Sequence, residues 1–311
     1  MTRIVYGLDT LQQAPSVVTI GNFDGVHVGH RALIQHAVTH AKAAGVRSVV
    51  MTFDPHPNAV IGRFDAPKKI QPLDERLDTL AASGVDLVLV MPFTAELAAL
   101  TPAQFVTDVL LGSLNVLRVV VGDNFRFGRD AEGDVTFLSQ AGEQHGFAVD
   151  VFGLLELDGT PVSSTKLRER IARGDMSWSA AALRRPFALT GEVVHGEARG
   201  RELGFPTANV HVADDLVFPG NGVYACEADV DGTRYAAVTN VGVRPTFGGV
   251  EPRIEVHLID TTADLYGKTL SVAFIARIRD ERPFDGIDAL ITQIGKDRDH
   301  ARAMLEIHGT N

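Results

Sequence analysis

The first half of the chain alternates short apolar runs with segments of helical spacing, and this alternation restricts the possible folds most strongly. Runs without polar alternation are typical of strands that are buried on both faces. Strands of this kind separated by helices predict an α/β domain with a Rossmann-like parallel sheet. Ligands of such sheets bind beyond the carboxyl ends of the strands. The expected strands are residues 17–20, 48–53, 85–90, 117–121 and 147–155, and the expected helices are residues 31–45, 73–83, 101–112 and 135–146.

The second half has shorter strands in which polar and apolar residues alternate. The Asp231-Gly232 pair between two such runs indicates a β-hairpin. The pattern predicts a compact antiparallel barrel or sandwich, followed by a helix over residues 287–307. A chain of 311 residues exceeds the usual size of a single core. We therefore expect two domains, residues 1–184 and residues 185–311.

Composition excludes several classes of protein. The net charge of −10 argues against a nucleic-acid-binding surface, and it requires local donors for any anionic ligand. No segment approaches the roughly 18 apolar residues of a membrane span, and the start lacks the apolar core of a signal peptide. We therefore expect a cytoplasmic protein with no membrane partner. The single cysteine, Cys226, lies in an alternating run, which favours a buried thiol over a nucleophile.

Residues 17–30, VVTIGNFDGVHVGH, combine a strand, a glycine turn and the start of a helix. The apolar run stops at Gly21, turns at Asp24-Gly25, and reaches His27 and His30 just before the helical pattern begins at Arg31. This order presents backbone N–H groups and the positive end of a helix to an anion. Two imidazoles at that point predict a site for phosphate groups. A structural or helix-capping role is the ordinary alternative for such a histidine pair. Metal binding is another alternative and has weak support, because no cysteine or third histidine lies at a supporting spacing.

A second cationic segment begins at Ser163, Ser164 and Thr165, which precede residues of helical spacing and can cap that helix. Lys166 and Arg168 follow within one turn, and both can contact a polyphosphate. A capped amphipathic helix with solvated cations is the simpler interpretation of the same residues.

In the second half, three glycines (Gly196, Gly200 and Gly204) divide a loop that can let backbone amides approach phosphates, although glycines also serve ordinary hairpins. Thr207 and Asn209 lie two residues apart, so they face the same side of an extended strand. Both offer hard oxygen ligands, which suit Mg²⁺.

Glu255 lies in a strand whose apolar residues (Ile254, Val256 and Leu258) define one face, so Glu255 and His257 point to the other face. A solvated polar face is the ordinary explanation of this pattern.

Four segments of the first half resemble, in order, the adenylyltransferase module of bacterial FAD synthetases. GNFDGVHVGH (residues 21–30) is similar to the family signature GxFDGVHxGH, whose HxGH element binds ATP phosphates in the wider nucleotidyltransferase superfamily. TFDPHP (52–57), VGDNFRFG (121–128) and SSTKLRERIARGD (163–175) follow, with Leu167 in place of the usual isoleucine.

The second half resembles riboflavin kinases. GEVVHGEARGRELGFPTANV (191–210) is similar to the signature GxGRGxxLGFPTAN, with Ala198 where the family often has glycine. NVGVRPTFGG (240–249), RIEVHLID (253–260), LYGKTLSVAF (265–274) and IRDERPF (278–284) continue the match. The chain is thus identified as a member of the bacterial bifunctional riboflavin kinase and FMN adenylyltransferase family.

The resemblance implies that the C-terminal barrel phosphorylates riboflavin with ATP to FMN. The N-terminal nucleotidyltransferase-type domain would then join FMN to AMP from a second ATP, giving FAD and pyrophosphate. Both steps would need Mg²⁺. One inactive module, or a non-catalytic flavin sensor, remains an alternative, and the oligomeric state stays open.

The resemblance also assigns residues. For adenylyl transfer it implies ATP binding by Gly21, Phe23, Asp24, Gly25, His27, His30, Ser164, Thr165 and Arg168, with His27, His30 and Asn124 in catalysis. For the kinase it implies ATP binding by Gly196, Gly200, Arg201, Thr207 and Asn209, with Thr207 and Asn209 as metal ligands. Glu255 would be the general base on the riboflavin 5′-hydroxyl, and Asn124 is a nucleotide or flavin contact.

Overall fold

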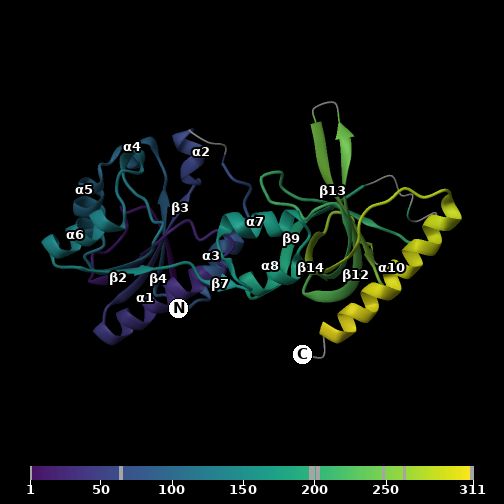
Figure 1. Cartoon of the computed structure of the whole chain (residues 1–311), viewed down its shortest axis with the longest axis horizontal. Coiled ribbons are helices and arrows are strands. Elements are labelled where there is room, and N and C mark those ends of the chain that lie inside the picture. Colours follow the sequence, from purple (N-terminus) through teal and green to yellow (C-terminus); the bar gives the residue numbers. More distant parts are fainter. Residues whose placement is uncertain are drawn as a thin grey trace. The chain divides into compact units, whose positions relative to one another are not determined.

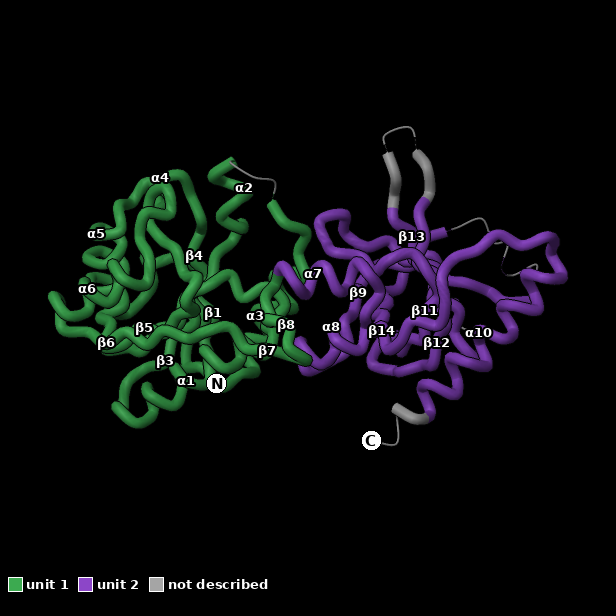
Figure 2. The backbone as a smooth tube through the Cα atoms, viewed as in Figure 1, with its two compact units in different colours: residues 1–164 green, residues 165–311 purple. Residues whose placement is uncertain are grey.

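A computed structural model describes residues 2–62, 66–195, 200, 204–246, 249–261 and 264–308 (Figure 1). The chain divides into two compact units, residues 1–164 and 165–311 (Figure 2). Each unit has its own sheet, so two separate folding cores are present. The expected domain boundary at 184/185, which follows the change in sequence rhythm, remains a prediction.

The first unit contains a six-stranded parallel sheet in the order β1-β4-β3-β2-β5-β6. The parallel sheet predicted from the apolar runs is therefore confirmed. The edge strand β1, in which three of four residues are exposed, was not predicted from the sequence. The predicted end of β6 at residue 155 is too late, because a small hairpin, β7 (Glu156–Leu157) and β8 (Thr160–Pro161), follows. The strands of the sheet are β1 Arg3–Tyr6, β2 Ser16–Ile20, β3 Arg47–Asp54, β4 Leu87–Pro92, β5 Val116–Gly122 and β6 Ala148–Phe152.

Helices cover both faces of this sheet (Figure 1). Successive strand residues point to opposite faces. Val50 accordingly packs with α1 (Val28–Ala44) and α3 (Leu73–Ala81), whereas its neighbour Met51 packs with the helices of the other face. That other face carries α5 (Pro102–Gln104), the π-helix η1 (Phe105–Ser113) and α6 (Val135–His145). The shorter helices are α2 Pro57–Ile61, α4 Ala95–Ala99 and η2 Arg129–Ala131.

The second unit contains a closed barrel of antiparallel strands in the order β10-β13-β12-β11-β14-β9. The antiparallel barrel and the terminal helix are both confirmed. The barrel strands are β9 Phe187–Val194, β10 Ala208–His211, β11 Gly222–Val230, β12 Thr233–Thr246, β13 Gly249–Leu258 and β14 Thr269–Arg279. The helices are α7 Ser164–Ala172, α8 Met176–Leu183 and α10 Ile287–His308.

The predicted hairpin turn joins β11 to β12. Val230 pairs with Thr233, and the two turn residues, Asp231 and Gly232, have φ of 53° and 80°. Two consecutive positive φ values define the turn that matches the twist of paired strands. Asp-Gly favours this geometry because both residues tolerate it.

The terminal helix α10 packs on the outer face of the barrel, where Ala301 and Leu305 contact Val223 and Ala225 of β11. The alternate β11 residue Cys226 is fully buried, and this burial raises the pKa of its thiol to about 12. The expectation of a buried strand thiol is therefore borne out.

Candidate active sites

Two of the motifs in the first unit, those that contain Gly21 and Asn124, follow neighbouring strands. In the sheet, β3 and β4 follow on one side of β2, and the later strand β5 pairs with the other side of β2. Such a reversal leaves a crevice at the carboxyl ends of the two strands, which is the usual binding position in open α/β sheets. Gly21 follows β2, and Asn124 follows β5. The topology thus brings both motifs to one edge of the sheet.

The turn after β2 is conformationally strained. Phe23, Gly25 and Val26 have φ of 51°, 83° and 44°, and Phe23 and Val26 are buried. Positive φ is unfavourable for a bulky or β-branched residue, at about 1–3 kcal/mol each. The strain is offset by packing of Phe23 and Val26 into the core beside Ile34 of α1. The turn therefore directs the chain straight into the start of α1.

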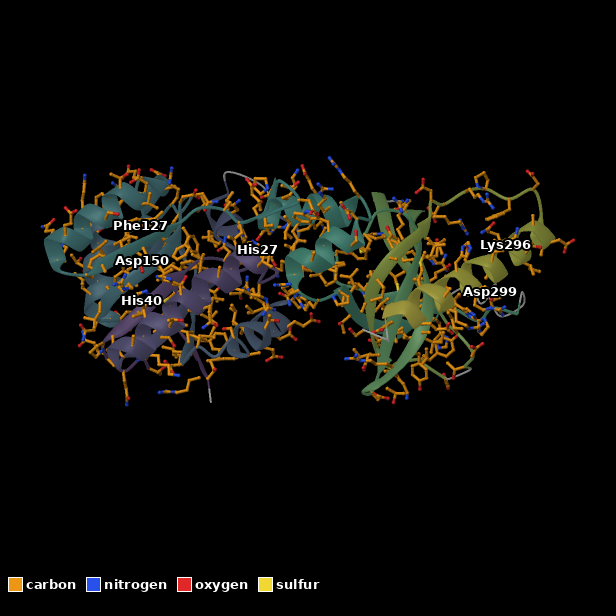
Figure 3. The ribbon with its side chains drawn as sticks, turned by 60° about the horizontal axis from the view of Figure 1, so that its bottom comes forward. His27, His40, Phe127, Asp150, Lys296 and Asp299 are labelled. Carbon is orange, nitrogen blue, oxygen red and sulfur yellow. The ribbon has the colours of Figure 1, made fainter. Side chains whose placement is uncertain are left out.

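His27 is the N-cap of α1, so the helix begins at Val28 and not at Arg31 as expected. Its Nδ1 accepts a hydrogen bond from the His30 backbone N–H at 3.4 Å, and the two rings stack with centroids 3.6 Å apart. Histidine is not a preferred N-cap residue, which explains the misplaced start. A neutral ring that accepts at Nδ1 carries its proton on Nε2, where it can donate to a phosphate oxygen. His27 is labelled in Figure 3.

Gly29 keeps the His27 ring in this position. A Cβ atom added at Gly29 would lie 3.2 Å from Cε1 and Nδ1 of that ring. Such a separation is tighter than ordinary van der Waals contact, so a side chain here would push the ring aside. The glycine of the HxGH element therefore leaves the ring of the first histidine undisturbed.

The Asp24 carboxylate has partners in the protein. It accepts hydrogen bonds from the backbone N–H groups of Ile70 (3.0 and 3.1 Å) and Gln71 (3.3 Å), and Asp24 is only 4% exposed. The Asp24 carbonyl oxygen accepts from Ser164 Oγ at 3.0 Å. Both groups therefore hold neighbouring segments of the first unit around the turn.

Polar groups that were not predicted from the sequence join the ends of β2 and β3. The side-chain amide of Asn22 lies 3.1 Å from His56 Nε2. Arg76, 8% exposed, donates to the Asn22 carbonyl at 3.0 Å and to the Phe53 carbonyl at 3.2 Å. Burial lowers the pKa of Arg76 from its ordinary value. The TFDPHP segment contained the signal for His56, whereas Arg76 lies in a helix with no motif.

The other first-site candidates occupy different surroundings. Asn124 is exposed after β5, and its Oδ1 would lie 3.1 Å from a Cβ added at Gly122. Thr165 and Arg168 lie on α7, in the second unit. On the same helix, Lys166 Nζ forms an ion pair with Glu169 Oε2 at 2.5 Å. This i,i+3 pair is the solvated-helix arrangement considered from the sequence.

The second unit holds a cavity of about 430 Å³ between the outer face of the barrel and α10. Its barrel wall contains one row of polar residues, because Glu255 of β13 pairs in register with Asn209 of β10 and with Asn240 of β12. Leu290 and Ile294 of α10 line the cavity as well. Glu255 therefore faces a pocket and is not part of an open solvated face.

Arg253 joins two members of this row. Its Nε and one terminal nitrogen donate to Asn209 Oδ1 at 3.1 and 2.9 Å, and that terminal nitrogen lies 2.6 Å from Glu255 Oε1. A cation that binds these oxygens must compete with the guanidinium. Arg253 was missed from the sequence, although it lies two residues before Glu255 and so shares its strand face.

Thr207 immediately precedes β10, and both Thr207 and Asn209 line the cavity, as does Gly200. A Cβ added at Gly200 would lie 2.5 Å from the Phe205 carbonyl oxygen. A side chain at this position would therefore collide with the backbone of the loop. Gly196, Ala198 and Arg201 lie outside the described residues.

At the far wall of the cavity, Arg279 of β14 forms a two-pronged ion pair with Asp297 of α10. Arg279 Nε lies 3.1 Å from Asp297 Oδ1, and a terminal nitrogen lies 2.8 Å from Oδ2. Asp297 is 2% exposed. Charged partners with this geometry and burial bind strongly, so the pair fixes α10 against the barrel.

Within the part of the chain that the structure describes, His36, His40 and Asp150 lie close enough together to bind one metal ion, and this group does not include His27 or His30. None of the helices described there has the length and apolar character needed to cross a membrane.

Comparison with known proteins assigns both units to families. Residues 9–166 match the family model of FAD synthetase, and residues 183–305 match that of riboflavin kinase. A crystal structure described as a macrolide-efflux protein from Streptococcus pneumoniae is 31% identical, with a TM-score of 0.87 over 97% of this chain and 98% of that one.

Curated relatives match over almost the whole length. The bifunctional riboflavin kinase/FMN adenylyltransferase of Escherichia coli (strain K12) is 40% identical over 304 residues, which cover 96% of this chain and 97% of the relative. The protein of the same name from Pseudomonas fluorescens is 41% identical over 305 residues, 97% of each chain. This chain therefore belongs to the family of bifunctional riboflavin kinases/FMN adenylyltransferases.

Proposed function

We propose that this chain makes FAD from riboflavin in two ATP-dependent reactions, one in each unit. The second unit transfers the γ-phosphoryl group of ATP to the riboflavin 5′-hydroxyl, giving FMN and ADP. The first unit transfers AMP from ATP to the FMN phosphate and releases pyrophosphate. The observation that carries the proposal is that each unit belongs to one of the two enzyme families and has its own polar site.

Adenylyl transfer requires positioning and charge stabilisation more than covalent chemistry. An FMN phosphate oxygen attacks the α-phosphorus of ATP, and negative charge accumulates on the phosphate oxygens. His27 and His30, at the N-terminus of α1, donate to these oxygens together with the first backbone N–H groups of the helix. Gly21, Phe23 and Gly25 shape the turn that carries them.

The remaining residues of this site have supporting roles. The family resemblance further assigns Ser164, Thr165 and Arg168 to the triphosphate and Asn124 to the nucleotide or flavin. Asp24 acts indirectly, because its carboxylate already accepts three backbone hydrogen bonds.

For the kinase, Glu255 accepts the proton of the 5′-hydroxyl as that oxygen attacks the γ-phosphorus. A cavity of about 430 Å³ is of the size that small-molecule ligands occupy. Its apolar residues on α10, Leu290 and Ile294, suit the flat flavin ring, while the polar row faces the ribityl hydroxyls.

Thr207 and Asn209 are the ligands that we propose for Mg²⁺. The donor set fits, since a hydroxyl, a carboxamide oxygen and the nearby Glu255 carboxylate line one cavity. When bound, Mg²⁺ neutralises charge on the transferred phosphoryl group. Arg253 would then give up its hydrogen bonds to Asn209 Oδ1. We further propose that Gly196, Gly200 and Arg201 bind the ATP phosphates of this unit.

Incubation of the pure chain with riboflavin, ATP and Mg²⁺, followed by chromatography of the flavins, tests the proposal. We expect FMN first and FAD after it. FMN without FAD would mean that the adenylyltransferase unit is inactive. Neither product, combined with quenching of riboflavin fluorescence by the protein, would favour the non-catalytic flavin sensor.

A further inference from the structure

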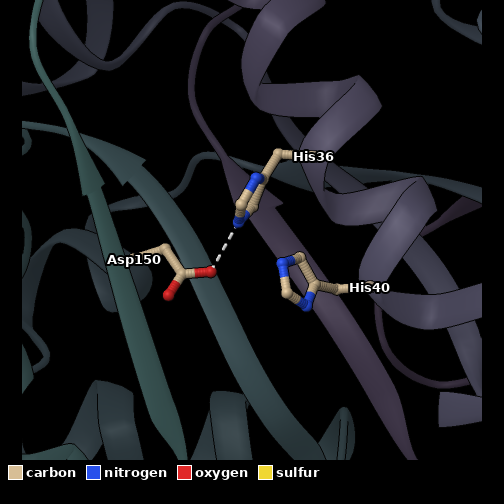
Figure 4. Close-up of side chains that lie close together, drawn as sticks. All are labelled: His36, His40 and Asp150. Carbon is tan, nitrogen blue, oxygen red and sulfur yellow. Dashed lines mark hydrogen bonds and ion pairs between the residues drawn. The ribbon is translucent and has the colours of Figure 1, made fainter. Parts of the chain in front are cut away.

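Three side chains of the types that bind transition metals meet on the first unit, at a place that neither reaction uses. His36 and His40 lie one turn apart on α1, and Asp150 lies on the edge strand β6 (Figure 4). One ligand atom from each lies within 4.8 Å of the other two. In Figure 3, His40 and Asp150 are close together, and His27 is well separated from them.

The arrangement is already compact. His36 Nε2 lies 2.7 Å from Asp150 Oδ2, and the rings of His36 and His40 have centroids 4.3 Å apart. The ring of Phe152 contacts His36 edge-on, with centroids 4.7 Å apart. Histidines at positions i and i+4 share one face of a helix, which is the spacing by which helical histidine pairs bind zinc.

We propose that His36, His40 and Asp150 bind one borderline transition-metal ion, with Zn²⁺ as the natural occupant. Two imidazole nitrogens and one carboxylate oxygen, with water in the fourth position, satisfy tetrahedral Zn²⁺. Imidazole ligands select Zn²⁺, Ni²⁺ or Cu²⁺ over Mg²⁺, so the ion differs from the one that the kinase requires. Bonds of about 2.1 Å place tetrahedral ligand atoms about 3.4 Å apart, which needs only small side-chain rotations.

The protonation and the charges of these three side chains are compatible with a bound Zn²⁺ ion. Zn²⁺ takes the place of the proton between His36 Nε2 and Asp150 Oδ2, and the neutral ring then carries its proton on Nδ1. Arg118 lies 2.5 Å from the other oxygen, Asp150 Oδ1, so it orients the carboxylate without occupying Oδ2. Arg118 donates to the Asp150 carboxylate, and a carboxylate binds a metal ion in this deprotonated form.

An ion here would connect two elements that flank the phosphate site. The helix α1 begins at His27, and His36 lies roughly 9 Å along it from His30, at about 1.5 Å per residue. At the end of β6, the Phe152 carbonyl accepts from the Asp123 backbone N–H at 2.8 Å, beside Asn124. The ion therefore braces the site and does not contact its substrates.

The test measures binding of Zn²⁺, and of Co²⁺ as a spectroscopic substitute, to the chelator-treated full chain. We expect one equivalent of Zn²⁺, a visible Co²⁺ spectrum of tetrahedral intensity, and a higher unfolding temperature of the loaded protein. His40→Ala and the nearly isosteric Asp150→Asn should weaken binding by about tenfold or more and abolish the spectrum. His145→Ala, an exposed histidine at the end of α6, is the matched control and should bind normally.

Two results would overturn the proposal. One is that the wild-type chain binds no Zn²⁺ at millimolar concentration. The other is that His40→Ala and Asp150→Asn both bind one equivalent with wild-type affinity and spectrum, which would mean that the ion is held elsewhere. Because Asp150→Asn preserves shape, its unfolding curve without metal separates lost binding from lost folding.

Discussion

The two candidate sites of this chain are built in opposite ways. In the first unit the site forms where parallel strands end, from a strained turn, the start of α1 and glycines. In the second unit the site lies on the face of antiparallel strands, from side chains that register brings into one row. The first design depends on backbone shape, whereas the second depends on register, because a slip of one residue would turn Glu255 to the other face. The two sites should therefore respond to different kinds of substitution.

Removal of the Glu255 carboxylate from the polar row should reduce enzyme activity more than any other substitution. Glu255→Gln preserves shape but removes the proposed base, so riboflavin phosphorylation should fall by about 10²–10⁴-fold. Formation of FAD from supplied FMN should not change. The measurement is steady-state product formation, with Glu192→Gln on the exposed face of β9 as the control. More than a tenth of normal kinase turnover in Glu255→Gln would rule out a general base at this position.

Removing an imidazole from the first site should have the next largest effect. His30→Ala loses a donor at the phosphates, which corresponds to about a 10²–10³-fold decrease in FAD formation from FMN. Riboflavin kinase activity should remain normal, as should both activities of His145→Ala. If His30→Ala slowed the kinase equally, the assignment of separate sites would be wrong.

The backbone dependence of the first site can be tested by adding one methyl group. In Gly29→Ala the new Cβ would lie 3.2 Å from the His27 ring. Displacement of this ring by a few tenths of an ångström should reduce adenylyl transfer by about tenfold. Gly295→Ala, in the helix α10, is the control because its Cβ would meet nothing within 4 Å. That variant should keep both activities and gain up to about 1 kcal/mol of stability.

In the second site, Arg253 competes with a metal ion for the oxygens of Asn209 and Glu255. Arg253→Ala releases Asn209 Oδ1 and Glu255 from a partly buried ion pair, worth about 1 kcal/mol or about fivefold. The Mg²⁺ concentration for half-maximal kinase activity should fall by up to that factor. An increase would show that Arg253 helps to bind ATP and does not compete with Mg²⁺.

The smallest effect concerns stability at high pH. Burial raises the pKa of Cys226 from 9.0 to about 12. Above pH 9 the unfolded chain releases this proton while the folded chain keeps it, so stability falls as pH rises from 9 towards 12. The single thiol contributes about 1.4 kcal/mol per pH unit in that window. Denaturant unfolding at pH 9 and 10 should show this extra loss in the wild type and not in Cys226→Ala; equal losses in both would argue against it.

Sequence patterns predicted the features that depend on local chemistry. The parallel sheet followed from apolar runs, and the Asp231-Gly232 hairpin followed from its turn residues. The capping box of Thr101 and Gln104, which starts α5, is another feature of this local kind, and both of its reciprocal hydrogen bonds are present. These features could be predicted because the residues that determine them lie within a few positions of one another.

Features that depend on distant contacts were missed. Arg76 reaches the Asn22 carbonyl from a helix that carries no motif. Arg253 of β13 reaches Asn209 of the neighbouring strand β10. No single stretch of sequence reveals the register of these two strands. Two short-range features also escaped: the start of α1, which histidine caps, and the exposed edge strand β1. The site residues themselves were assigned by family motifs, and their roles remain proposals.

The most direct test of two independent sites is the set of flavins that each single variant makes from riboflavin, ATP and Mg²⁺. We expect His30→Ala to accumulate FMN without FAD. We expect Glu255→Gln to leave riboflavin unchanged, yet to convert supplied FMN to FAD at the wild-type rate. Loss of both reactions in either variant would show that the two sites are not independent.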